Sequence, residues 1–120
     1  MRDLMASEIR RFANTCTWSL QGWRAAWASE KSLRQWTVVN LLSAGLAFTL
    51  DLSTGERALI LALGVLVLAA ELFNTAIEEA VDLASPGPNP RAGKAKDCGS
   101  AGVALAALAG GIAWAVILIG

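Results

Sequence analysis

Four polar residues recur at helical spacing in one of the most apolar parts of this 120-residue sequence. Glu71, Asn74, Glu78 and Asp82 are separated by three, four and four residues, which places them on one side of an α-helix. Glu71 is the only charged residue between positions 58 and 77. A carboxylate at the centre of a membrane-spanning helix costs about 2.5–3.5 kcal/mol on insertion scales, so such a residue usually has a function. The stripe therefore predicts a functional site, although a row of interhelical hydrogen bonds would use the same residue types.

Histidine is absent from the sequence, and with it the commonest general base and metal ligand. Acid–base or metal chemistry must then use carboxylates, lysine or cysteine. Glu30 lies near the end of the N-terminal segment, and Lys94, Lys96 and Asp97 directly precede the last apolar run. Mg²⁺ prefers oxygen ligands and is typically held by one or two carboxylates plus substrate phosphates. These groups suit a divalent cation with a phosphate, although the lysines alone also fit a membrane-topology signal.

The composition excludes a disordered chain. Apolar residues make up 55% and charged residues 17% of the sequence, against about 45–50% and about 25% in average proteins, whereas disorder requires few apolar residues and much charge. The formal net charge is zero, so nothing in the charge balance indicates a nucleic-acid partner. Cys16 and Cys98 have no metal-binding spacing, and we expect both to be small buried residues.

Three stretches lack charged residues: 35–50, 58–70 and 98–120. The hydrocarbon core of a bilayer, about 30 Å thick, is crossed by about 20 apolar residues in a helix. The third stretch is long enough by itself, the second is long enough if Glu71 is tolerated, and the first must tilt or include the residues just before it. We therefore predict an all-α membrane protein, a single domain over residues 1–120, with three transmembrane helices at about 33–50, 56–82 and 97–118.

The lysines and arginines give these helices a direction. Residues 1–34 contain six of them, the second connection (82–97) contains three, and the first connection (51–57) contains only Arg57. Because cytoplasmic loops carry the excess of Lys and Arg, the N-terminus and the second connection are expected in the cytoplasm.

The segment over residues 7–30 has the pattern of an amphipathic helix. Its apolar residues fall on one side at about 100° per residue: Ile9, Phe12, Cys16, Leu20, Trp23 and Trp27. We expect this helix to lie in the cytoplasmic membrane interface, with Trp23 and Trp27 at headgroup level. Trp18 lies nearly opposite, on the polar side, which indicates a partner that stacks on its ring.

These runs resemble a known family. The sequence ELFNTAIEEAVD (71–82), followed by AKD (95–97), is similar to the signature of the prokaryotic diacylglycerol kinases, and GWRAAWASE (22–30) is similar to their N-terminal part. The resemblance covers roughly residues 9–118. It implies a small three-span kinase of the bacterial inner membrane, a homotrimer with active sites shared between subunits. Such an enzyme transfers the γ-phosphoryl group of MgATP to a lipid alcohol at the cytoplasmic face; with diacylglycerol the product is phosphatidic acid.

The resemblance also implies roles for individual residues. Glu71 would be the general base for the lipid hydroxyl and Asn74 would hold the reacting groups. Glu30 and Glu78 would ligate Mg²⁺. The expected ATP contacts are Arg11, Trp18, Glu30, Glu78, Gly93, Lys96 and Asp97, and the expected lipid contacts are Glu71 and Ser100.

Two other functions remain open at this stage. Undecaprenol is the acceptor for related proteins of the same family, and a non-enzymatic subunit could use Glu71 as an ion site. The run Gly99-Ser100-Ala101 favours diacylglycerol, and the ion-site hypothesis leaves Glu30, Glu78, Lys96 and Asp97 unexplained. Trp36 departs from the family, which often has Glu at that position.

Overall fold

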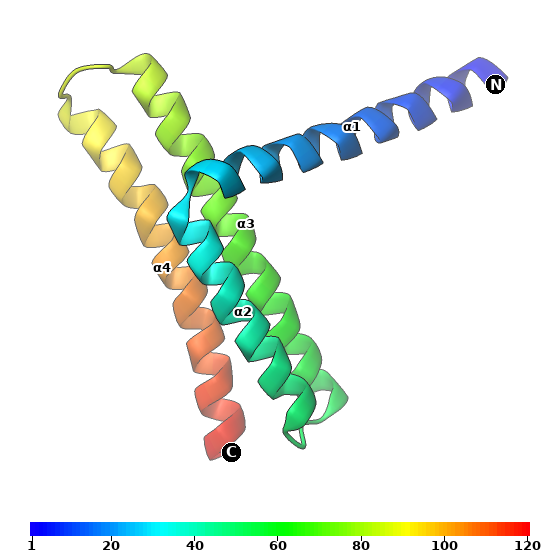
Figure 1. Ribbon diagram of the computed structural model, residues 1–120, viewed down its shortest axis with the longest axis vertical. Coiled ribbons are helices and arrows are strands. Elements are labelled where there is room, and N and C mark those ends of the chain that lie inside the picture. Colours follow the sequence, from blue (N-terminus) through cyan, green and yellow to red (C-terminus); the bar gives the residue numbers. More distant parts are fainter. The chain divides into compact units, whose positions relative to one another are not determined.

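The computed structural model describes all 120 residues and contains four α-helices and no strand. They are α1 (Arg2–Ser29), α2 (Lys31–Thr49), α3 (Thr54–Ala84) and α4 (Pro90–Ile119), labelled in Figure 1. The all-α prediction is confirmed. The chain divides into two units, residues 1–30 and residues 31–120, and the expectation of one domain stays a prediction.

The first unit is the helix α1, which is five residues longer at its start than expected. Trp23 and Trp27 stack on each other with ring centroids 5.8 Å apart, as residues four apart on one face of a helix can. Three side-chain hydroxyls of α1 each donate a hydrogen bond to the backbone carbonyl four residues earlier: those of Thr15, Thr17 and Ser19. These hydroxyls are therefore satisfied within the helix, which suits the predicted interfacial position.

The second unit begins with the antiparallel pair α2 and α3 (Figure 1). A capping box starts α3: Ser53 Oγ accepts from the Glu56 amide at 3.1 Å, and the Ser53 amide donates to Glu56 Oε1 at 2.9 Å. Arg57 closes the other side of the turn, because its Nε donates to the Ala47 carbonyl at 2.7 Å and its guanidinium lies 5.5 Å from the centre of the Phe48 ring. Together these contacts satisfy backbone groups at both helix ends.

The second hairpin joins α3 to α4. The helix α4 begins at Pro90, before the predicted span of about residues 97–118, which it contains; the bounds of that span stay a prediction. The reason for this start is local: Asn89 is the N-cap, its Oδ1 accepting from the Arg91 amide at 2.9 Å, and Pro90 occupies the first turn, where its fixed φ suits a helix. The sequence run Gly93–Asp97 is therefore helical. With 31 and 30 residues, α3 and α4 are longer than the roughly 20 residues that a bilayer requires.

Two helices, α3 and α4, are long and apolar enough to cross a membrane. Few of their residues are buried inside the chain, namely Ile60, Val67, Glu71, Val103 and Ala113, so they are not core helices of a globular fold. Large apolar side chains such as Val65, Phe73 and Leu105 are exposed. With 19 residues that include Lys31 and Arg34, α2 does not meet the same criterion, and the third span stays a prediction.

The second unit has few buried contacts. Most of them involve α3, which packs on both α2 and α4. Ala47, Ile60 and Ala113 form a small cluster with one residue from each helix. Trp114 Nε1 donates to Ser43 Oγ at 2.8 Å and so ties α4 to α2. Cys16 and Cys98 are both exposed, so the expectation of buried cysteines is wrong: each lies on a helix face that the chain does not cover.

Candidate active site

Glu71 lies in the seam between α2 and α3, and its side chain is the most buried charged group in the chain, at 4% exposure. Ser32 Oγ donates to its Oε2 at 3.0 Å. Sequence reasoning missed Ser32, although a signal exists. Ser32 is 17 residues before Thr49, the last residue of α2, and Glu71 is 17 residues after Thr54, the first residue of α3. In an antiparallel helical hairpin such positions face each other.

Asn74 lies one turn further along α3 and connects the buried part of the stripe to its polar end. Its Nδ2 donates to Glu78 Oε1 at 3.1 Å. Its Oδ1 is buried and has no hydrogen-bond partner, and it lies against Gly99 of α4. The predicted helical stripe is therefore present, and the orphaned amide oxygen marks a place where a ligand could donate a hydrogen bond or a cation could bind.

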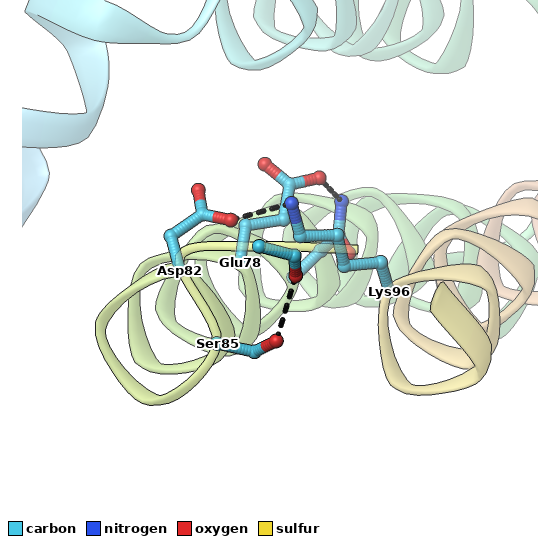
Figure 2. Close-up of polar contacts among 6 residues, drawn as sticks. Glu78, Asp82, Ser85 and Lys96 are labelled. Carbon is cyan, nitrogen blue, oxygen red and sulfur yellow. Dashed lines mark hydrogen bonds and ion pairs between the residues drawn. The ribbon is translucent and has the colours of Figure 1, made fainter. Parts of the chain in front are cut away.

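The end of the stripe is an ion pair between the two long helices. Lys96 Nζ lies 2.5 Å from Asp82 Oδ1, and Figure 2 shows the Lys96 side chain extending from α4 toward Glu78 and Asp82 on α3. Both side chains are partly exposed, at 42% and 61%. In the adjoining connection, Ser85 Oγ donates to the Gly87 carbonyl at 2.9 Å.

A surface pocket of about 550 Å³ opens beside this ion pair. Asp82, Gly93 and Lys96 line it together with the connection over residues 85–90. The structure thus brings together two of the predicted nucleotide contacts, Gly93 and Lys96, at one end of the α3–α4 hairpin. Asp82 lies beside them, so that a positive and a negative group are adjacent at the edge of an open pocket.

Two predicted residues of α4 stand outside this arrangement. Asp97 is exposed and does not line the pocket, and Ser100 is exposed and makes no hydrogen bond. Asp97 lies on a different side of α4 from Lys96, since successive residues turn by about 100°, whereas Ser100 lies one helical turn beyond Lys96 and outside the pocket. Their predicted roles in ATP and lipid binding stay predictions.

Three predicted residues belong to the first unit. Arg11 and Trp18 are exposed on α1, and Glu30 ends that helix in an extended conformation, with φ −107° and ψ 105°. Ser29 Oγ donates to Glu30 Oε1 at 3.3 Å. No group of three or more Asp, Glu, Cys or His residues is close enough to hold a metal ion, so metal binding by Glu30 and Glu78 stays a prediction.

Trp36, the departure from the family pattern, lies away from the stripe. It lines an apolar pocket of about 230 Å³ between α2, α3 and α4, together with Asn40, Ser43 and Trp114. An indole suits such a lining better than a carboxylate does. Trp36 therefore contributes an aromatic side chain to a part of the hairpin that is lined mainly by apolar residues.

The fold and the site together define the class of the protein. It is a helical membrane protein with a buried carboxylate on one helix, continued by an amide, a carboxylate and an ion pair toward one end of that helix. Residues 17–118 match the family model for prokaryotic diacylglycerol kinase. The chain belongs to this family, as its motifs predicted.

Curated relatives agree over nearly the whole chain. A diacylglycerol kinase of Pseudomonas aeruginosa is 41% identical over 112 residues, which cover 93% of this chain and 91% of the relative. The diacylglycerol kinase of Escherichia coli K12 is 36% identical over 108 residues, covering 90% and 88%. That of Haemophilus influenzae is 35% identical over 110 residues, covering 92% and 93%.

Proposed function

We propose that the chain is a diacylglycerol kinase, which transfers the γ-phosphoryl group of ATP to the free hydroxyl of diacylglycerol and releases phosphatidic acid and ADP. The observation that carries the proposal is the buried carboxylate of Glu71 at one end of a polar row that leads along α3 to a lysine and an open pocket. A base inside the apolar region meets an acceptor that also resides there, while the nucleotide binds at the polar end. The names of the family and of its curated relatives support the same activity.

In this reaction Glu71 accepts the proton of the lipid hydroxyl. The oxygen then attacks the γ-phosphorus, and the bond from that phosphorus to the ADP oxygen breaks. Phosphoryl transfer requires little covalent assistance and depends on positioning and charge neutralisation. The side chain of Glu71 is 4% exposed, so the lipid hydroxyl reaches it only when neighbouring side chains rearrange.

The nucleotide would bind at the hairpin end of α3 and α4. Lys96 would contact its phosphates, with Gly93, Asp97 and Glu78 nearby, and Arg11 and Trp18 of α1 would complete the site. Lys96 is paired with Asp82. Because exposed ion pairs contribute only about 0–1 kcal/mol, exchange of Asp82 for a phosphate costs little.

Mg²⁺ fits the residues present. Glu78 would supply a carboxylate, and the partnerless Oδ1 of Asn74 would supply a further oxygen one turn away. Mg²⁺ usually takes only one or two carboxylates and completes its shell with phosphate and water, so two protein carboxylates suffice. Glu78 and Glu30 would hold the ion, which neutralises phosphate charge when it is bound.

The wider arrangement follows the family resemblance. We propose that α2 is the third span, that α1 lies in the cytoplasmic interface, and that the N-terminus and the α3–α4 connection are cytoplasmic. The excess of Lys and Arg in those segments supports this orientation. The extent of exposed apolar surface on α2–α4 is compatible with lipid and with a homotrimer in the bacterial inner membrane.

The test is ATP-dependent labelling of defined lipids by the purified protein in mixed micelles. We expect Mg²⁺-dependent phosphorylation of diacylglycerol, loss of it in Glu71→Gln, and retention in Glu79→Gln, which changes an exposed carboxylate of the same helix. If the protein phosphorylates undecaprenol in preference to diacylglycerol under the same conditions, undecaprenol is the acceptor lipid. Absence of labelled lipid from either acceptor would favour the ion-site alternative.

A further inference from the structure

The carboxylate of Glu71 has one protein donor, and that donor comes from another helix. Ser32 Oγ, in the first turn of α2, donates to Glu71 Oε2 at 3.0 Å across a sequence separation of 39 residues. The neighbouring side chain of Leu33 is completely buried, so this end of α2 is held firmly in the seam. The hydrogen bond therefore belongs to the packed interface between α2 and α3 and is not a contact between exposed side chains.

The hydroxyl of Ser32 differs from six other helical hydroxyls in this chain. Those that donate to the carbonyl four residues earlier in their own helix are Thr15, Thr17, Ser19, Ser29, Thr37 and Thr75. Ser32 is the second residue of α2, so its helix contains no residue four positions earlier. Its single O–H is consequently directed to Glu71 instead.

We propose that Ser32 is a positioning residue for phosphoryl transfer: its hydroxyl holds one oxygen of Glu71 so that the other oxygen stays oriented to accept the proton of the lipid alcohol. This inference rests on the proposed role of Glu71 as the general base. A hydroxyl has one proton to donate and a carboxylate has two accepting oxygens. The contact therefore engages Oε2 and leaves Oε1 available.

The physical need for such a contact follows from the side chain itself. Glutamate has three rotatable bonds, and the last of them has a broad, weakly restrained profile. A hydrogen bond from a neutral donor to a carboxylate is stronger than one between neutral groups. The Ser32 hydroxyl thus removes the rotation that would otherwise move the basic oxygen, and general-base catalysis is sensitive to such displacement.

The first experiment compares Ser32→Ala and Ser32→Thr in the full-length protein in mixed micelles, with diacylglycerol and MgATP. We expect Ser32→Ala to lower kcat about 5- to 30-fold while the KM for ATP and the thermal midpoint stay near those of the parent. Ser32→Thr keeps the hydroxyl and should recover at least about half of the lost kcat. Thr37→Val is the matched control, because its hydroxyl bonds only within α2.

The second experiment places Ser32→Ala in a Glu71→Gln background. With no base left to orient, the second substitution should change the residual turnover less than about twofold. An equal loss in both backgrounds, or a fall in thermal midpoint that parallels the fall in kcat, would overturn the positioning role in favour of simple helix–helix adhesion. If Ser32→Ala fails to assemble, Ser32→Cys, with its weak donor, gives the same comparison.

The two proposals fail in different ways. Full turnover in Glu71→Gln would show that Glu71 is not the general base, and the positioning role of Ser32 would then be overturned as well. If Glu71→Gln loses turnover while Ser32→Ala keeps full turnover, the assignment of Glu71 as the base stands and only the positioning role of Ser32 is overturned.

Discussion

The side-chain amide of Asn74 on α3 lies directly against the backbone of Gly99 on α4, and the contact leaves no room for a Cβ atom. A methyl group at Gly99 would collide with Oδ1 of Asn74 and lie 3.4 Å from both its Cγ and the Ile77 Cδ1. The amide is in turn bonded to Glu78. The glycine therefore determines where the middle of the polar stripe lies.

Gly99→Ala should displace the Asn74 amide and break its alignment with Glu78. We expect kcat to fall at least about tenfold, and the free energy of unfolding to fall by about 1–3 kcal/mol because the contact becomes overpacked. Gly102→Ala is the control, since a Cβ there meets nothing within 4 Å. Steady-state kinetics and thermal unfolding in the same detergent measure both effects. Equal kcat and equal stability of the two variants would show that the close approach of Gly99 to Asn74 is not required for either property.

Glu71→Gln preserves the shape of the side chain but removes its basicity. We expect kcat to fall about 10²–10⁴-fold, with little change in the KM for ATP. The protein should be at least as stable as the parent, because a costly buried carboxylate is replaced by a neutral amide. Should turnover persist while thermal stability or assembly is lost, Glu71 is structural and the assignment as base is wrong.

Glu30→Gln and Glu78→Gln should each weaken Mg²⁺-dependent turnover severely and leave the protein folded. The reason is that the sequence has no histidine to replace a lost carboxylate ligand. Titration of activity with Mg²⁺ should show a higher half-saturating concentration in both variants and an unchanged one in Glu79→Gln. Near-normal activity of either variant would exclude that residue as a ligand.

The tryptophans of α1 should divide between the two substrates. Trp18 is 63% exposed and lies away from the apolar side, so Trp18→Ala should raise the apparent KM for ATP more than that for lipid. Trp23 stacks on Trp27 on the apolar side, so Trp23→Ala should weaken membrane seating or lipid access. Kinetics against each substrate, with flotation on vesicles, test the division; equal effects of both variants on both substrates would contradict it.

Arg57 should stabilise the fold without affecting the reaction. Its side chain bonds the carbonyls of Ala47 and Leu52 at the opposite end of the α2–α3 hairpin from Glu71. We expect Arg57→Ala to lower the free energy of unfolding by about 1–2 kcal/mol with kcat unchanged, and Arg57→Lys to recover little because lysine cannot reproduce the planar, two-donor geometry. Denaturant titration of the three proteins measures the difference, and a large loss of kcat would indicate coupling between the two ends.

Much of this protein is readable from the sequence alone. The spacing of Glu71, Asn74 and Glu78 predicts one polar helix face, because helical periodicity depends only on residue number. Charge-free runs of sufficient length predict helices that can cross a membrane, since the bilayer imposes a length and a polarity. The same residues identify the family before any contact between helices is known.

The contacts between helices are a property of the tertiary structure. Ser32 meets Glu71, Gly99 meets Asn74, and Lys96 meets Asp82 because the two connections set the register of α3 against its neighbours. Lys96 lines the pocket at the end of the stripe, whereas Asp97 and Ser100 do not. A periodic pattern states which side of a helix is polar, but the partner across the seam depends on loop length, helix ends and side-chain packing, and these are decided only when the helices come together.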